Sequence, residues 1–206
     1  MLYSYKMTDD TGFAPNPFHG ILTIANCKPL IRLKKEKLDF IAGFTSKKMS
    51  KGKFEKELLV YIMKVTEKLS YSEYFNDPRF QCKIPTKKSL ISIAGDNIYE
   101  PSPMAAKRFI QKPNPYHNDG KDMDHDLKGK YVLISDDFFY FGRGAIPIDI
   151  DLFQIKIPKF QSGHGVKTAN EDEVIKLWKY LSDKHKKNVV LFPPDKWKEN
   201  EPFNNI

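Results

Sequence analysis

The chain has 206 residues, 40% of them hydrophobic and 13% aromatic, and carries a formal net charge of +8. A chain of this length can bury a proper core, and this composition excludes an intrinsically disordered protein. The excess of Lys and Arg favours an acidic partner such as a nucleotide or nucleic acid, although a lysine-rich surface also serves solubility alone.

Cysteine usage and hydropathy indicate where the protein works. Two cysteines, Cys27 and Cys82, are too few for a disulfide framework in a chain of this size. The N-terminal residues form neither a basic nor an apolar leader, and the longest apolar run, residues 58–63, is too short to cross a bilayer. We therefore expect a single cytoplasmic domain over residues 1–206, without a membrane partner.

Hydrophobic patterning predicts strands in the first third of the chain. They span residues 2–7, 21–26, 40–44 and 58–65. Glycines and prolines constrain the loop formed by residues 10–20, between the first two strands. Residues 41–65 are expected to form a hairpin whose Lys-rich tip, residues 46–53, is either an ordinary solvated loop or a phosphate contact.

The middle of the chain alternates short elements with polar stretches. Residues 70–75 are expected to form one helical turn, with Ser70 as N-cap and Glu73 as its capping-box partner. Residues 89–94 are expected to form a strand that ends at Gly95. Residues 101–130 are rich in Pro, Asn, Asp and Gly and predict a long loop or lid, in which residues 104–110 are the one helix-like part.

The last third predicts two strands, an extended segment and a helix. The strands are residues 131–135 and 138–142, expected side by side, followed by extended residues 146–157 at a sheet edge. Residues 170–184 are a helix that Asn170 and Glu173 cap, and its apolar stripe should cover a sheet face. Residues 193–206 read as a loosely held tail. These elements predict an α+β fold with a mixed, strongly curved sheet or open small barrel and a C-terminal helix packed on it.

Reactive side chains concentrate at the exit of the second strand. Cys27 is a candidate nucleophile because Lys28 and Arg32 can favour a thiolate, but a cysteine at a strand end is more often a small buried hydrophobe. Lys28 and Arg32 are candidate ligands for phosphate or carboxylate. In the preceding loop, Asp10 is a candidate general base, and Asn16 offers the donor and acceptor that read a base edge. Both have a concrete alternative as turn-forming residues.

Metal ligands and familiar catalytic motifs give a weaker signal. One acidic patch resembles a site for a divalent ion, and it comprises His117, Asp119, Asp122, Asp124, His125 and Asp126. Its spacing fits no metal motif, so we predict no metal and leave the cofactor open. His19 and His164 are possible acid–base groups. The sequence has no Walker loop, GxGxxG, GxSxG or HExxH, which excludes ordinary ATPases, dinucleotide oxidoreductases, α/β-hydrolases and zincins.

Four blocks in order carry a resemblance to a known family. They are DTGFAPNPFHG, TIANCKPLIR, GDNIY and VLISDDFFYFG. Together they resemble the second of the nucleotide-modification-associated domain families. The resemblance implies modification of nucleotides or nucleic-acid bases, with DNA favoured over RNA, partner modification enzymes, and a phage or defence setting.

The resemblance also adds candidate ligand contacts. It implies roles for Asp96, Asn97 and Tyr99 in the GDNIY block, which otherwise is ordinary turn chemistry. Tyr5 and Tyr140 offer rings on which a base can stack, although aromatic residues in strands are more often core. We expect one cleft that joins the 10–20 loop, residues 27–32 and residues 96–99.

Two classes of function fit these expectations. In the first, the protein is an enzyme or enzyme subunit of base modification, in which Asp10 or Cys27 moves a proton or attacks, and Lys28 and Arg32 hold a phosphate. In the second, it is a non-catalytic reader of modified bases, since the strand order loosely resembles small barrels of the pseudouridine-synthase-associated type. A reader needs an aromatic pocket and a basic rim but no reactive group. A scaffold partner of a modifying enzyme is a third, weaker possibility.

Overall fold

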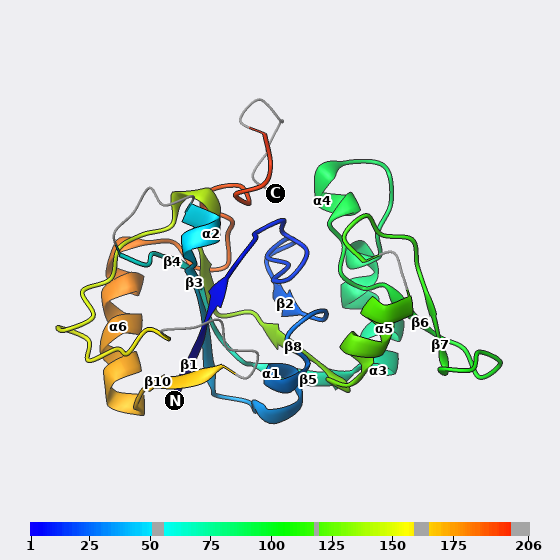
Figure 1. Cartoon of the computed structure of the whole chain (residues 1–206), viewed down its shortest axis with the longest axis horizontal. Coiled ribbons are helices and arrows are strands. Elements are labelled where there is room, and N and C mark those ends of the chain that lie inside the picture. The colour runs from blue at the N-terminus through cyan, green and yellow to red at the C-terminus, as the bar shows by residue number, and fades with distance from the viewer. Residues whose placement is uncertain (51–55, 118–119, 159–164, 199–206) are drawn as a thin grey trace.

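The computed structural model describes residues 1–50, 56–117, 120–158 and 165–198. Its described strands form three separate sheets, with order β10-β1-β3-β4-β9, β2-β8-β5 and β6-β7. In Figure 1 the first sheet and helix α6 make one side of the molecule, α3, α4 and α5 make the other, and β2 lies between them. The predicted α+β class is confirmed. The predicted strongly curved sheet or open small barrel is not confirmed, because the described strands form separate sheets that do not close into a barrel.

The five-stranded sheet is the larger of the two main sheets. β1 runs parallel to β3, and every other pair of neighbouring strands in this sheet is antiparallel. The predicted pairing of residues 41–65 is confirmed, since β3 and β4 are hydrogen-bonded over Phe40 to Phe44. The strands are β1 Leu2–Met7, β3 Phe40–Thr45, β4 Leu59–Lys64, β9 Phe138–Tyr140 and β10 Val166–Ala169.

Helix α6, Glu171–Lys184, covers one face of this sheet, as predicted. Asn170 is its N-cap, and the Glu173 carboxylate accepts a hydrogen bond from the Asn170 amide. Val174, Leu177 and Leu181 are fully buried against strand residues. The ring of Trp178 meets those of Phe40 and Phe139 edge-on, with centroids 5.0 Å apart in both pairs. The apolar stripe therefore anchors the C-terminal third of the chain.

The second sheet lies against the opposite face of the first. It consists of β2 Leu22–Ile24, β8 Tyr131–Ser135 and β5 Glu67–Ser70, all antiparallel. Leu22, Ile24 and Leu133 share a buried cluster with residues of the first sheet such as Tyr5 and Met63. The prediction that residues 131–135 and 138–142 lie side by side is wrong. Between β8 and β9 the chain crosses from one sheet to the other, so β8 pairs with β2 and β5 while β9 pairs with β4.

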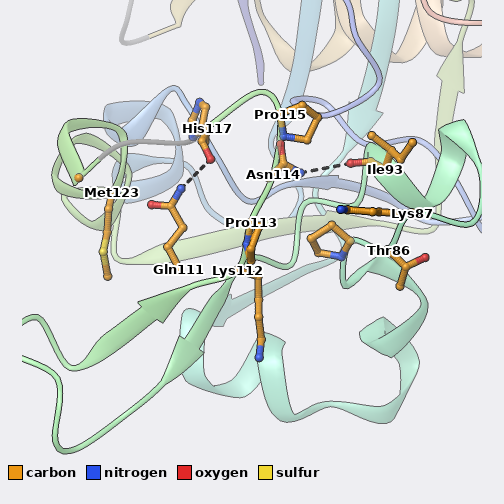
Figure 2. A pocket seen from close by; sticks show the side chains of 12 residues that line it. Thr86, Lys87, Ile93, Gln111, Lys112, Pro113, Asn114, Pro115, His117 and Met123 are labelled. Atoms are coloured by element: carbon orange, nitrogen blue, oxygen red, sulfur yellow. Dashed lines mark hydrogen bonds between the residues drawn. The ribbon is translucent and has the colours of Figure 1, made fainter.

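The third sheet pairs β6 Tyr99–Pro101 with β7 Phe109–Gln111. Residues 104–110 therefore do not form the predicted helix. The end of β7 and the residues that follow it, 111–115, line a pocket (Figure 2). Residues 101–130 also contain α5, Gly120–Leu127, so this stretch is more regular than the predicted loop. Whether any of it acts as a lid stays a prediction.

Short helices complete the described chain. The Ser70 and Glu73 capping box is confirmed at the start of α3. The strand predicted at residues 89–94 is wrong, because Ser89 and Ser92 form a capping box that opens a helix there. The helices are α1 Pro29–Lys34, α2 Lys47–Ser50, α3 Tyr71–Asn76, α4 Leu90–Ile93, and the 3-10 turns η1 Pro78–Lys83 and η2 Gly142–Gly144. Residues 51–53 of the predicted hairpin tip lie outside the described residues.

The segments on either side of α6 and β10 differ from prediction. Residues 146–157 form no strand, and their one ladder contact is an isolated bridge from Ile146 to Leu59. The predicted loose tail begins with a buried anchor. Trp197 stacks on Phe18 with centroids 5.4 Å apart, and its Nε1 donates to the Thr11 carbonyl at 3.0 Å. Residues 199–206 lie outside the described part.

In the part of the chain that the structure describes, no helix combines the length and apolar character that crossing a bilayer requires.

Replacing Leu177 with Ala should lower the free energy of unfolding by about 3 kcal/mol, because it leaves a cavity between α6 and the sheet. Ile175 lies two residues away and is 52% exposed, so Ile175→Ala is the matched control, with an expected change within about 0.5 kcal/mol. Urea unfolding of both variants measures the difference. Equal effects would contradict the assigned face of α6.

Candidate functional site

The site is organised by a sharp corner between β2 and α1. Cys27 and Lys28 are consecutive non-glycine residues with left-handed backbone, at φ 55° and 42°. Such conformations cost about 1–3 kcal/mol each and persist where surrounding contacts hold them. Pro29 opens α1, where its fixed φ suits the first helical position. The side chain of Asn26 steadies the corner by donating to the Asp96 carbonyl at 2.8 Å.

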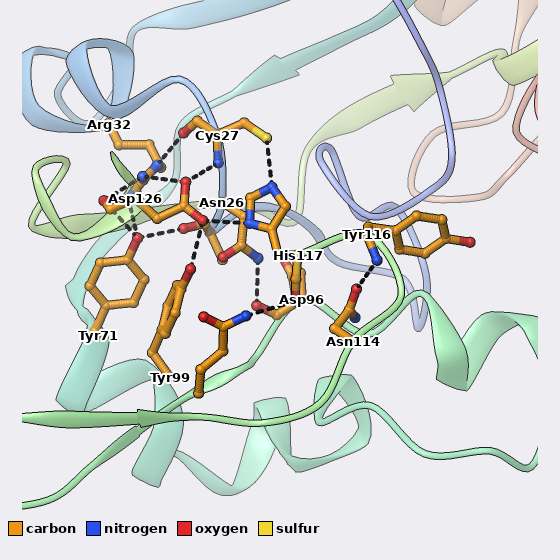
Figure 3. A network of polar contacts seen from close by, with 12 residues as sticks. Asn26, Cys27, Arg32, Tyr71, Asp96, Tyr99, Asn114, Tyr116, His117 and Asp126 are labelled. Atoms are coloured by element: carbon orange, nitrogen blue, oxygen red, sulfur yellow. Dashed lines mark hydrogen bonds and ion pairs between the residues drawn. The ribbon is translucent and has the colours of Figure 1, made fainter. Parts of the chain in front are cut away.

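The corner places Cys27 in line with a histidine and an aspartate. Cys27 Sγ lies 3.5 Å from His117 Nε2, and His117 Nδ1 lies 2.8 Å from Asp126 Oδ2. Figure 3 shows the sulfur directed at the imidazole, with Asp126 on the other side of the ring. The Nδ1 contact is a close ion pair without an aligned hydrogen bond, since the N–H does not point along the line to the oxygen. Thiol, imidazole and carboxylate thus stand in the order of a nucleophile, a base and an orienting group.

Electrostatics give His117 an unusual protonation behaviour. Burial lowers its pKa, but the Asp126 carboxylate and the Cys27 sulfur outweigh burial and raise the pKa of His117 to about 10. The ordinary value for histidine is about 6.5. An imidazole in this setting holds its proton through the neutral range.

Asp126 is also a fixed structural anchor. Its carboxylate is fully buried, accepts from the Cys27 amide at 2.6 Å and accepts from the Tyr99 hydroxyl at 2.9 Å. Burial and the neighbouring carboxylate raise the pKa of Tyr99, so its hydroxyl stays protonated as a donor. One carboxylate therefore contacts both the His117 ring and the backbone of Cys27.

Arg32 connects the Cys27 and Asp126 segments through hydrogen bonds. Its side chain is fully buried, with Nε donating to the Cys27 carbonyl and Nη2 donating to the Asp126 carbonyl, both at 2.7 Å. Nη1 donates to the Tyr71 hydroxyl at 2.5 Å and to the Tyr131 carbonyl at 2.9 Å. Gly129 leaves space for it, since a Cβ there would lie 2.5 Å from Nη1. The guanidinium of Arg32, which was predicted to bind a phosphate, is thus engaged by acceptors of the protein. It stabilises the corner between β2 and α1.

Asp10 lies in a separate polar environment. Its carboxylate is buried and accepts from the Tyr140 hydroxyl at 2.8 and 2.7 Å. Burial raises the pKa of Asp10 to about 6, against hydrogen bonds from Tyr140 and Gly12 that lower it. Within the described chain, no hydrogen bond or ion pair joins Asp10 to Cys27 or Lys28.

Tyr5 is close to both the Cys27 sulfur and the Asp10 carboxylate. Its hydroxyl shares a 2.8 Å hydrogen bond with Tyr61, and burial, with added effects of Cys27 and Asp10, raises its pKa. The ammonium of Lys28 lies 4.6 Å from the centre of the Tyr5 ring. Burial lowers the pKa of Lys28, and the Cys27 sulfur opposes that shift. Tyr5 and Lys28 are therefore close to Cys27, whereas Tyr140 pairs with Asp10.

The three remaining predicted ligand contacts are engaged in the fold. Asn16 accepts at Oδ1 from Lys83 Nζ at 2.6 Å and donates to the Ala94 carbonyl at 2.8 Å. Asp96 accepts from the hydroxyls of Thr23 and Tyr74 at 2.6 and 2.7 Å, and burial raises its pKa. Asn97 donates to the carbonyls of Tyr74 and Phe80. All three are at least 98% buried, so they connect segments and do not face a ligand here.

A pocket of about 940 Å³ opens beside His117 (Figure 2). None of the catalytic or ligand-binding residues predicted from the sequence lines it, but His117 of the acidic patch does. No Phe, Tyr or Trp is among its described lining residues either, so it lacks the aromatic cage of a base reader. The lining comprises Pro85, Thr86, Lys87, Ile93, Gln111, Lys112, Pro113, Asn114, Pro115, His117, Gly120 and Met123.

The described residues of the acidic patch do not converge as metal ligands. Among the described residues, no three His, Cys, Asp or Glu side chains converge as metal ligands do. His117 and Asp126 do come together, but with Cys27. Asp119 of that patch lies outside the described residues, as does His164.

The contacts of His117 and Asp126 with Cys27 were not predicted from the sequence. They follow Cys27 by 90 and 99 residues, a separation at which no local pattern signals contact. The one available signal is a lone cysteine with histidine and aspartate elsewhere in the chain, which has low specificity.

The family comparison covers nearly the whole chain. The chain belongs to the nucleotide modification associated domain 2 family, whose profile matches residues 1–201. The sequence resemblance is thereby confirmed, and the family points to a role in nucleotide modification. No curated protein and no solved structure matched the chain.

Replacing Asp126 with Asn should bring the pKa of His117 down from about 10 toward its ordinary value. In the wild type, the raised pKa stabilises the fold below the unfolded value of about 6.5, and that contribution is lost as pH rises toward 10. The variant should lose this dependence. NMR titration of the His117 ring and unfolding curves at several pH values measure both effects.

The matched control is Asp124→Asn, which removes a carboxylate of the same helix that is 58% exposed and pairs with Lys107. Its His117 pKa should stay near 10. An unchanged His117 titration in Asp126→Asn would show that Asp126 does not set it.

Proposed function

We propose that this protein is an enzyme that modifies nucleotides or nucleic-acid bases through a covalent bond to Cys27. The alignment of Cys27, His117 and Asp126 carries the proposal, because a thiol, an imidazole and a carboxylate in this order make an activated nucleophile. Membership of a nucleotide modification family supplies the substrate class.

Each of the three residues has a distinct task. With its pKa raised to about 10, the His117 imidazole carries a positive charge 3.5 Å from the Cys27 sulfur near neutral pH, and this charge favours attack by the sulfur. The proton on Nε2 then passes to the leaving group or to the atom that gains electrons. Asp126 orients the ring and stabilises its positive charge without taking the proton.

Arg32 supports catalysis without touching the substrate. By binding the Cys27 and Asp126 carbonyls, its guanidinium fixes the distance between the segments that carry nucleophile and carboxylate. This is a positioning role, and it replaces the phosphate contact expected from the sequence.

Lys28, Tyr5 and Asp10 are assigned further tasks in this proposal. Lys28 lies beside the nucleophile and is the cation that meets an anionic group of the substrate or of the intermediate. Tyr5 presents the ring under that cation. Asp10, with a pKa of about 6, can exchange a proton near neutral pH and remains a candidate acid–base group. A preference for DNA over RNA and a partner modification enzyme stay predictions.

Mass spectrometry of nucleosides from cells with and without the protein tests the proposal. The wild type should create or remove a modified nucleoside, and Cys27→Ser and His117→Gln should each reduce that change by about 10³-fold or more. Cys82 is exposed and its sulfur contacts the Arg79 carbonyl, so Cys82→Ser is the control and should retain full activity.

Full activity in Cys27→Ser would overturn the covalent mechanism. An unchanged nucleoside profile, together with tight binding of a modified base, would instead assign the protein to the class of readers.

A further inference from the structure

The pocket beside His117 has the dimensions of a small-molecule site. Its volume of about 940 Å³ is within the range of roughly 300–1,000 Å³ that ligand sites occupy. His117 belongs both to its wall and to the contact with Cys27, since His117 Nε2 lies 3.5 Å from the sulfur. A ligand in the pocket would therefore lie beside the residue whose ring contacts the Cys27 sulfur.

Much of the pocket lining is apolar. Pro85, Ile93, Pro113, Pro115 and Met123 supply rings and alkyl groups of the kind against which a base can stack. Figure 2 shows four of them, Ile93, Pro113, Pro115 and Met123, along the lining of the pocket. The wall thus suits the face of a base better than a polar sugar or a peptide backbone.

This wall is held in place before any ligand binds. Asn114 Nδ2 donates to the Gly95 carbonyl at 3.0 Å, and Asn114 Oδ1 accepts from the Tyr116 amide at 2.8 Å. Gln111 Nε2 donates to the His117 carbonyl at 2.7 Å, which links the lining directly to the catalytic histidine. A preformed wall lowers the ordering cost of binding.

A single amine completes the pocket. Lys87 is exposed and points toward the space between Pro113 and Asn114 in Figure 2. No ion pair of Lys87 occurs within the part of the chain that is described. Lys112, the other lysine of the lining, is paired with Glu100 at 2.5 Å and extends away from the pocket. One available ammonium beside an apolar wall matches one phosphate attached to a base-bearing unit.

We infer that this pocket binds a nucleoside monophosphate unit, with the phosphate at Lys87 and the base against the proline-rich wall next to His117. The inference rests on the proposed function and names where its substrate is held. The unit is either a free nucleotide or one nucleotide turned out of a strand, because both present the same base and phosphate.

Calorimetric titration with each of the four deoxynucleoside monophosphates and with the matching nucleosides tests the inference. In the wild type at least one monophosphate should bind roughly tenfold more tightly than its nucleoside, because of the charge-assisted contact. Lys87→Gln should remove this preference. Lys88→Gln, at an exposed neighbour that does not line the pocket, is the control and should keep it. Equal phosphate preference in wild type and Lys87→Gln overturns the inference.

Two further experiments distinguish a free nucleotide from a nucleotide within a strand, and failure of the pocket assignment from failure of the proposed function. A single-stranded oligonucleotide of about ten residues competes with the monophosphate if the unit comes from a strand, and fails to compete if it is a free nucleotide. Cys27→Ala should bind as the wild type does, because Cys27 does not line the pocket. Lys87-dependent binding by a Cys27→Ala protein that still modifies nucleosides would refute the proposed function alone. Loss of modification in Cys27→Ala, with no Lys87-dependent binding, would refute the pocket alone.

Discussion

The site depends on the buried pair of Arg32 and Asp126. Both side chains are fully buried, and their charges lie 3.6 Å apart. Together they bind the carbonyl and the amide of Cys27, the hydroxyls of Tyr71 and Tyr99, and the ring of His117. Removing one member of such a pair leaves an uncompensated charge, at a cost of about 3–5 kcal/mol. The same pair that connects β2, α1 and α5 therefore also fixes the position of Cys27 relative to His117.

The two packed sheets explain why this pair is placed where it is. α6 closes one face of the five-stranded sheet, and β2 with β8 closes the other. β2 then delivers Cys27 to the edge of the packed layers, where α5 supplies Asp126 and the segment before it supplies His117. Strain at Cys27 and Lys28 is stored at this junction, as is common at functional sites.

Local signals in the sequence predicted much of the fold and part of the site. The α6 helix and the Ser70 capping box follow from residues three or four apart, so one segment of sequence determines them. Cys27 was identified by its charged neighbours. The pairing of β8 with β5 and the alignment of His117 with Cys27 depend on segments about 60 to 90 residues apart, and no local pattern encodes these contacts. Buried amides such as Asn16 and Asn97 read like ligand contacts in sequence because an amide that bonds to backbone and one that bonds to a base are the same residue.

The most direct test of the central claim is the rate at which iodoacetamide alkylates each cysteine, followed by peptide mass spectrometry across pH 5 to 9. Cys27 is half-buried and Cys82 is exposed, so access alone predicts faster reaction at Cys82. Activation by His117 predicts the reverse near pH 7, with the advantage of Cys27 lost in His117→Gln while Cys82 is unchanged. Slower alkylation of Cys27 than of Cys82 at every pH, unaffected by His117→Gln, would contradict the account.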